Sequence, residues 1–264
     1  MNPPAPAGQQ DMANTRTRSA DGTEIGFDRQ GSGPALIMVD PAGGYSGFDQ
    51  LHGLAARLAD HFTVIRYDRR GRGRSQDTPP YAVAKEIEDL TAMVDEAGGS
   101  ASVYGLSSGG LLALHAATEG VPITSLVLFE PPVRAEGEPP DTRFTNEIKA
   151  LVAEGRRQEA VTHFLTGIGV PPEYLGPVPP AFEAVAHTLA YDCEISNATT
   201  FDLLRRVETR TLILDSQGSS EDLTGGAGAI AEALPKGTLH SLQGGWHGAP
   251  DEDIAEAVID YLTR

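Results

Sequence analysis

The residues whose types and spacing point most directly to chemistry are Gly105, Ser107 and Gly109. They form the pattern G-x-S-x-G, which sets a serine on a sharp turn between a strand and a helix. Side chains two residues before and after the serine would collide with the flanking strand and helix, and glycine removes that collision. The turn presents the Ser107 hydroxyl at a helix N-terminus, where free N–H groups favour negative charge. This spacing predicts a serine nucleophile.

The sequence around this turn fits the strand–turn–helix context of the motif. A short run with β-branched and aromatic residues begins at residues 102–104, and such a run is typical of a buried strand. After the turn, Leu111–Ala117 is predicted to be a helix. The backbone N–H of Ser108, the residue after the nucleophile, would lie free at the helix start. Ser108 is therefore a candidate donor to an oxyanion.

Alternating strands and helices are predicted on both sides of the turn. The predicted strands are Thr15–Ser19, Glu24–Arg29, Ala35–Asp40, Phe62–Asp68, Ile123–Glu130, Arg210–Ser216 and Thr238–Leu242. The predicted helices of this series are Phe48–Asp60, Val83–Glu96, Asp222–Leu234 and Ile254–Thr263. The series predicts an α/β fold with a mostly parallel sheet flanked by helices.

One long stretch interrupts the series. Residues 133–207 contain only helical segments broken by Pro and Gly, such as Thr145–Gln158, Glu159–Thr166 and Ala181–Tyr191. We therefore expect a core of residues 15–132 and 208–264, with a helical insertion over the carboxyl ends of the strands, where such sheets bind ligands. Residues 1–14, rich in Pro, Ala, Gln and Asn, are predicted to be a disordered leader.

Composition excludes several classes of function. The net charge of −17 over 264 residues argues against nucleic acid or an anionic membrane as a partner. Cys193 is the single cysteine, so an intrachain disulfide or a Cys-rich metal site is excluded. The first residues lack the apolar region of a signal peptide, and no run approaches the length of a membrane span. We expect a cytoplasmic protein, and composition does not predict an oligomeric state.

These landmarks together resemble the α/β-hydrolase superfamily over essentially all of residues 15–264. The matching parts are the first hairpin, the segment Tyr67–Ser75, the G-x-S-x-G turn, the helical insertion and a late histidine. The resemblance implies that the insertion 133–207 is a cap over the active site. It also implies a catalytic triad whose nucleophile, acid and histidine occur in that order along the chain.

The resemblance assigns the base to His247. This residue lies in Gly244-Gly245-Trp246-His247-Gly248, the loop between the last predicted strand and the last helix, where the family carries its catalytic histidine. Imidazole has an unperturbed pKa of about 6.5, so it can accept a serine proton at neutral pH. The other six histidines lie in helices, in the cap or on a strand, where packing or solvation accounts for them.

Two carboxylates compete for the role of the acid. Most of the superfamily carries the acid a few residues beyond the strand that here is Arg210–Ser216, but Gly218 occupies that position and Asp215 is offset from it. The family's other placement follows the strand after the nucleophile helix, and there Glu130 ends the strand before Pro131-Pro132. A charged group at the end of a buried strand needs a partner. We favour Glu130, with Asp215 as the alternative.

The Ser–Glu–His order resembles that of the zearalenone-type lactone hydrolases. These enzymes share the Ser-Ser-Gly of residues 107–109 and a Glu at the next strand end, although Leu106 replaces an expected Cys. Serine rather than aspartate at 107 argues against dehalogenase or epoxide-hydrolase chemistry. In the superfamily, the second oxyanion donor lies in the loop after the strand that corresponds to Ala35–Asp40 of this chain. Pro41 lacks an N–H, so that donor is predicted to be Ala42 or Gly43.

The arginine-rich run Arg69–Arg74 lacks the spacing of a phosphate-binding loop. We interpret it as a brace that holds the loop near the nucleophile through charge-paired contacts.

The sequence hypothesis is a cofactor-free serine hydrolase of a mid-sized apolar ester or lactone, working through an acyl-enzyme. Aromatic residues of the cap and of the histidine loop, Phe182, Tyr191 and Trp246, are predicted to line the pocket. The alternative keeps the same triad in a lyase, C–C hydrolase or cyclase acting on a polyketide-like substrate. A non-catalytic binder is a third class, which predicts a lost triad member.

Overall fold

The computed structural model describes residues 15–264, and the predicted leader, residues 1–14, lies outside the described residues. Eight strands form one sheet in the order β1-β2-β4-β3-β5-β6-β7-β8. Their bounds are β1 Arg16–Arg18, β2 Glu24–Gln30, β3 Ala35–Val39, β4 Thr63–Tyr67, β5 Ala101–Leu106, β6 Ile123–Phe129, β7 Thr211–Ser216 and β8 Gly237–Leu242. The pairings β1–β2 and β2–β4 are antiparallel and the others are parallel. The predicted fold class is confirmed.

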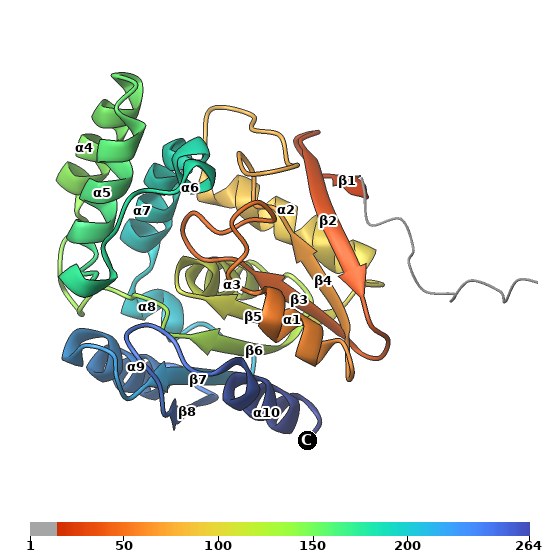
Figure 1. Ribbon diagram of the computed structural model, residues 1–264. Helices are drawn as coiled ribbons and strands as arrows, with labels where there is room; N and C mark the ends of the chain where they lie inside the picture. The colour runs from red at the N-terminus through yellow and green to blue at the C-terminus, as the bar shows by residue number, and fades with distance from the viewer. Residues whose placement is uncertain (1–14) are drawn as a thin grey trace, which may run out of the picture.

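The described residues also form ten α-helices and two 3-10 turns. In Figure 1, α4, α5, α6 and α7 stand together to one side of the helices that cover the sheet. The helices of the alternating series are α1 His52–Leu58, α2 Val83–Glu96, α3 Ser108–Thr118, α9 Glu221–Ala233 and α10 Asp251–Leu262. Between β6 and β7 lie α4 Thr142–Ala153, α5 Arg157–Gly167, η1 Pro172–Tyr174, α6 Pro180–Ala184, η2 Ala186–Thr188, α7 Leu189–Ala198 and α8 Phe201–Leu204. None of the described helices is long and apolar enough to cross a bilayer.

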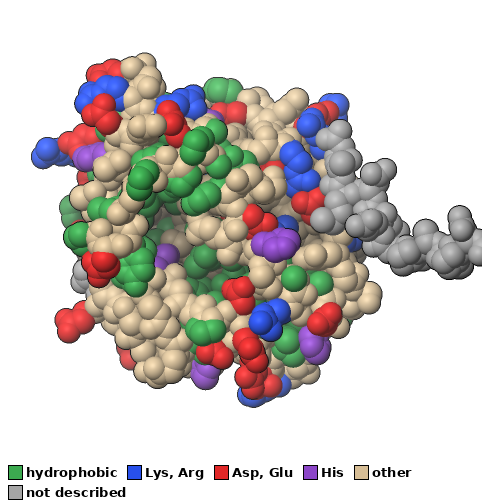
Figure 2. All heavy atoms as spheres, viewed as in Figure 1, with side chains coloured by type: hydrophobic (Ala, Val, Ile, Leu, Met, Phe, Trp, Pro, Cys, Tyr) green, Lys and Arg blue, Asp and Glu red, His purple; other side chains and the backbone are tan. Residues whose placement is uncertain are grey.

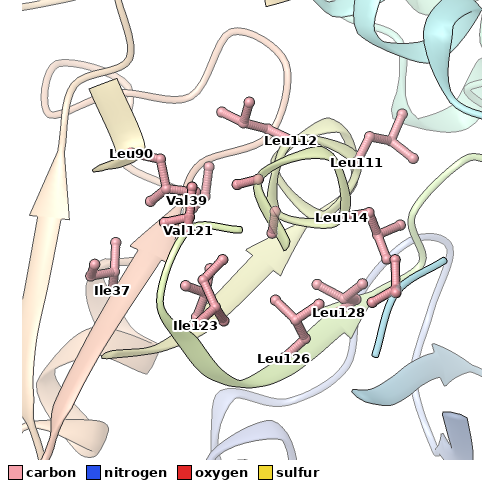
Figure 3. Packing of buried hydrophobic residues seen from close by; sticks show 14 of the residues in the cluster. Ile37, Val39, Leu90, Leu111, Leu112, Leu114, Val121, Ile123, Leu126 and Leu128 are labelled. Carbon is pink, nitrogen blue, oxygen red and sulfur yellow. The ribbon is translucent and has the colours of Figure 1, made fainter. Parts of the chain in front are cut away.

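Side-chain alternation along the strands builds a core on each face of the sheet. On β3, Ile37 and Val39 pack into one cluster with α2, α3 and α9, whereas Leu36 and Met38 pack into the other with α1 and α10. Both sets are fully buried because a parallel sheet is covered on both faces. Figure 3 shows part of the first cluster, in which Leu114 of α3 points toward Leu128 of β6.

The insertion between β6 and β7 has a small apolar core of its own, which includes Ile148, Phe164 and Phe182. The continuous helix predicted over Ala181–Tyr191 is wrong, because the chain breaks there into α6, η2 and α7. The break brings Thr188 to the start of α7 and within hydrogen-bond reach of an arginine of the core domain. A tertiary contact thus accompanies the departure from helical periodicity.

The turn between β5 and α3 leaves no room for side chains at its two glycines. A Cβ at Gly105 would lie 2.6 Å from the Cα of Gly110 in α3, as the motif predicts. A Cβ at Gly109 would lie 2.3 Å from the carbonyl oxygen of Val39, so its close neighbour is the adjacent strand β3 rather than β5. Both separations are far below van der Waals contact, so these glycines allow α3 to start directly at the sheet edge.

Asp40, the residue after β3, is a buried carboxyl group in an unfavourable environment. Its side chain is 2 % exposed, and its Oδ1 has no hydrogen-bond partner among the described residues. Burial raises the pKa of Asp40 to about 6, and the nearby carboxylates Asp49 and Asp68 add to this increase. The positive charges of Arg66 and Arg72 lower the pKa but do not outweigh burial.

Replacement of Gly109 by alanine should lower the free energy of unfolding by about 2 kcal/mol or more, because the new Cβ meets backbone that cannot move away cheaply. The matched control is Gly225→Ala in α9, where an added Cβ meets nothing within 4 Å and should stabilise the helix by about 0.5–1 kcal/mol. Urea unfolding measures both. Equal effects of the two substitutions would contradict the steric account.

Asp40→Asn should stabilise the protein in a pH-dependent way. The folded pKa of about 6 lies above the unfolded value, so the wild type loses stability as pH rises from about 4 to 6. The variant lacks this loss, and its advantage should grow by up to about 3 kcal/mol over that interval and then stay constant. Urea unfolding of both proteins at pH 4.5 and 8 measures it, and a pH-independent difference would contradict this environment for Asp40.

Candidate active site

The ends of neighbouring parallel strands bring Ser107 and Glu130 to the same edge of the sheet. Ser107 follows β5 directly, and its N–H donates to the carbonyl of Phe129 at 2.9 Å. Glu130 follows β6 directly, and its N–H donates to the carbonyl of Leu214 in β7 at 2.9 Å. The sheet hydrogen bonding therefore continues into both residues and fixes their positions relative to each other.

Glu130 and His247 form the closest polar contact of the site. The Oε2 of Glu130 lies 2.6 Å from the Nδ1 of His247, and its Oε1 accepts from the N–H of Ser216 at 2.8 Å. The Glu130 side chain is fully buried, while that of His247 is 18 % exposed. An ionised carboxylate only accepts hydrogen bonds, so Nδ1 of His247 carries the proton in this contact and Nε2 becomes the acceptor of the neutral ring.

Asp215, the alternative acid, does not contact His247. It precedes Ser216 on β7, and successive strand residues face opposite sides of the sheet. Ser216 faces the histidine loop, since its hydroxyl donates to the carbonyl of Gly245 at 2.7 Å. Asp215 is buried, and its Oδ1 has no partner among the described residues. The geometry pairs the histidine with Glu130 and not with Asp215.

The loop that carries His247 is held from several sides. The N–H of His247 donates to the hydroxyl of Ser219 at 2.9 Å, and the N–H of Gly245 donates to the carbonyl of Gly248 at 3.0 Å. A Cβ at Gly244 would lie 2.2 Å from the Gly248 carbonyl oxygen, so this loop can close only with glycine there. The imidazole is thus fixed by its backbone as well as by Glu130.

Backbone strain concentrates on the same three residues. Among the described non-glycine residues, positive φ occurs at Ser107 (53°), Glu130 (43°) and His247 (51°). Such a conformation costs about 1–3 kcal/mol per residue and persists only where the surrounding structure enforces it. It clusters at functional sites in general, and here it singles out the serine, the carboxylate and the histidine.

Ser107 and His247 line a common cavity of about 240 Å³ beneath the insertion. Figure 2 shows hydrophobic side chains gathered around a hollow on this face of the molecule. Its apolar walls include Leu111, Pro132, Phe144, Phe164, Ile168 and Trp246. Polar groups of the insertion, among them Thr145 and Asn197, also line it. The cavity therefore offers an apolar surface with a few hydrogen-bonding groups.

Of the three aromatic residues predicted to line the pocket, the structure places only Trp246 there. Phe182 instead stacks on Phe48, with ring centroids 5.2 Å apart, in the core of the insertion. Tyr191 stacks on Tyr81 at 3.9 Å, and its hydroxyl donates to Asp77. The prediction is wrong for Phe182 and Tyr191, because both rings find aromatic partners away from the cavity.

The two candidate positions for the second oxyanion donor differ in their surroundings. Ala42 lines the cavity together with Ser108, whereas Gly43 packs against Phe182. A Cβ at Gly43 would lie 2.1 Å from the Phe182 ring, and the φ of Gly43 is 72°. Gly43 therefore serves the turn, and of the two candidates only Ala42 lines the cavity.

The arginine run braces this part of the site, as predicted. Arg69 pairs with Glu86 and Asp192, and Arg72 also pairs with Asp192. Burial alone would raise the pKa of Asp192, but Arg72 and Arg69 outweigh it and hold that pKa below its usual value. No sequence pattern marks Asp192, which lies in the insertion far along the chain from its partners.

Cys193 is a second potential nucleophile that lines the cavity. Burial raises the pKa of its thiol to about 12, so the thiol is protonated at neutral pH. Its environment is that of a packed side chain.

Comparison with known proteins agrees with the fold. An alpha/beta hydrolase from Sphaerobacter thermophilus is 42 % identical with a TM-score of 0.87, over 94 % of this chain and all of that one. A hydrolase from Pseudomonas aeruginosa is 25 % identical with a TM-score of 0.80, over 96 % of this chain and all of that one. An uncharacterized hydrolase of Bacillus subtilis is 33 % identical over 105 residues, only 38 % of the length of either protein. The model of the alpha/beta hydrolase family matches residues 36–260, and this chain belongs to that family.

Proposed function

We propose that this chain is a serine hydrolase that cleaves a carboxylic ester or lactone through an acyl-enzyme. The observation that carries the proposal is the 2.6 Å contact between Glu130 and His247, beside a serine at the strained turn of the same cavity. Acyl transfer by a serine requires a base that is oriented by a third group, and we propose Ser107 as the nucleophile, His247 as the base and Glu130 as the third group.

Each member of the triad has a defined task in this mechanism. The Oγ of Ser107 attacks the carbonyl carbon while Nε2 of His247 takes its proton. Glu130 keeps the imidazole in the required tautomer and stabilises the imidazolium that forms. The same proton then passes to the leaving alkoxide, which departs as an alcohol and leaves the acyl group on Ser107. Water, activated by His247, hydrolyses that ester and regenerates the enzyme.

The N–H groups of Ser108 and Ala42 are proposed to hold the oxyanion that forms in both halves of the reaction. Ser108 lies at the start of α3, where backbone N–H groups have no helical acceptor and the helix dipole favours negative charge. Ala42 lies on the loop after β3 and also lines the cavity. Loss of one such donor typically reduces the rate by about 10²–10³.

The cavity supports an apolar substrate of moderate size. Its volume of about 240 Å³ suits an acyl chain or ring that contacts Leu111, Phe144 and Trp246. A lactone would place both the acyl and the alcohol part of the substrate in this one cavity. The Ser–Glu–His order, which resembles that of zearalenone-type lactone hydrolases, favours including lactones in the proposal.

Ser107→Ala should abolish hydrolysis of a nitrophenyl ester, with kcat/KM falling by about 10⁴-fold or more because no acyl-enzyme can form. Release of nitrophenolate measures the rate, and the thermal unfolding midpoint checks that the variant is folded. Retention of wild-type turnover would contradict the proposal.

Analysis of the products from a macrocyclic lactone distinguishes hydrolysis from the lyase or cyclase alternative, since hydrolysis adds one water.

Glu130→Gln should lower kcat by about 10³–10⁴-fold, because the amide cannot stabilise the imidazolium. Asp215→Asn is the matched control, a buried carboxylate in the next strand without contact to His247, and its kcat should stay near that of the wild type. The same nitrophenyl ester serves both variants. The reverse result, with Asp215→Asn impaired and Glu130→Gln active, would assign the acid to Asp215.

A further inference from the structure

We propose that Asp192 of the insertion is a positioning residue for the oxyanion hole, acting through Arg72 and Ser108. This rests on the proposed function, since it concerns the donors that hold the oxyanion. Asp192 is 3 % exposed and lines the cavity from α7, and it would not touch the reacting atoms itself. Its role would be to keep two backbone N–H groups aimed at one point.

Both carboxylate oxygens of Asp192 are engaged. Oδ1 accepts from the Ser108 hydroxyl at 2.7 Å and from Nη1 of Arg69 at 2.8 Å. Oδ2 accepts from Nη2 of Arg72 at 2.7 Å. Hydrogen bonds to an ionised carboxylate are short and strong, so this group fixes one side chain at the start of α3 and two in the loop after β4.

Arg72 carries the constraint to the loop after β3. Its Nη1 donates to the carbonyl of Pro41 at 2.7 Å and to that of Gly44 at 3.3 Å. The Pro41 carbonyl and the Ala42 N–H belong to one planar trans peptide unit and point in opposite directions. By holding the carbonyl, Arg72 therefore sets the direction of the N–H that is proposed to bind the oxyanion.

The two donors depend on Asp192 to different degrees. The peptide that carries the Ser108 N–H is also held by backbone bonds, because the Ser107 carbonyl accepts from the N–H of Gly110 at 2.9 Å. The Pro41 carbonyl accepts from the N–H of Gly44 at 3.0 Å and from Arg72. Asp192 contacts Ser108 only at its hydroxyl, whereas Arg72 contacts the Pro41 carbonyl itself, so the main effect of Asp192 is expected through Arg72 on the Pro41–Ala42 peptide.

The charges of the cluster allow geometry to be separated from electrostatics. Arg69 and Arg72 face Glu86 and Asp192, so the buried group is formally neutral. Removal of the Asp192 charge leaves excess positive charge near the oxyanion, which by itself would stabilise the negative oxygen. A fall in kcat on neutralising Asp192 therefore reports lost positioning and not lost attraction.

The arginine run also supplies a matched control. Arg70 pairs with Asp89 through two hydrogen bonds of 2.7 Å, and both side chains are at most 1 % exposed. In the structure, Asp89 contacts neither Ser108 nor the loop after β3 in any described hydrogen bond. Asp89→Asn therefore removes a buried, arginine-paired carboxylate of the same kind without touching the proposed donors.

The experiment compares Asp192→Asn with Asp89→Asn in the full chain. Both should lower the unfolding midpoint, since each removes a buried carboxylate partner of an arginine, and Arg70 keeps its second partner, Asp21. Asp192→Asn should also reduce kcat for a nitrophenyl ester by about 10–10²-fold, a loss not above that of a whole oxyanion donor, with little change in KM. Phosphonylation of Ser107 by a fluorophosphonate, whose adduct places an oxygen in the same hole, should slow in parallel. Asp89→Asn should retain the wild-type values of both.

If the kcat values of folded Asp192→Asn and Asp89→Asn are equal, the positioning role is overturned. If Asp192→Asn does not fold, Arg72→Lys replaces it, with Arg70→Lys as its control. Lysine keeps the charge but cannot bridge Asp192 and the Pro41 carbonyl in the same geometry, so Arg72→Lys alone should lose kcat. Absence of phosphonylation of Ser107 in the wild type would instead overturn the proposed function, and the positioning role with it.

Discussion

The hydrogen bond between Glu130 and His247 connects the residue after β6 to the loop after β8. Glu130 directly follows β6, whereas His247 lies in a loop beyond β8, 117 residues further along the chain. Two features position Glu130 for this contact. The parallel pairing of β6 with β7 sets Phe129 beside Leu214, and the N–H of Ser216 donates to the second oxygen of Glu130. A fully buried carboxylate is costly without partners, and these two partners offset that cost. The strained backbone of both residues persists within the same framework.

The insertion is joined to the core by buried charge as well as by apolar packing. Asp192 of α7 reaches Arg69 and Arg72, and Thr188 reaches Arg72 from the start of the same helix. A buried ion cluster contributes little net stability after desolvation, but it specifies one geometry. Through Asp192, helix α7 of the insertion is hydrogen-bonded to Ser108 at the start of α3.

The parts that could be predicted from the sequence are those that depend on local rules. Strand periodicity, the glycines around Ser107 and a glutamate at the end of a buried strand are visible in one dimension, and the first of these gave the fold class. Pocket residues are different, because Phe182 and Phe144 look alike in sequence and both pack in the insertion core, but only Phe144 also lines the cavity. The pairing of Asp192 with Arg72, 120 residues away, leaves no local pattern at all.

In the proposed mechanism, the acyl group of the substrate is transferred to Ser107 before water releases it. Acid quenching during turnover of a slowly deacylated nitrophenyl ester, followed by peptide mapping, locates the covalent intermediate. Ser107 and Cys193 both line the cavity, so the two peptides give an unambiguous comparison. We predict one acyl group on the peptide that contains Ser107. An acyl group on Cys193, or hydrolysis without any acylated peptide, would contradict the account.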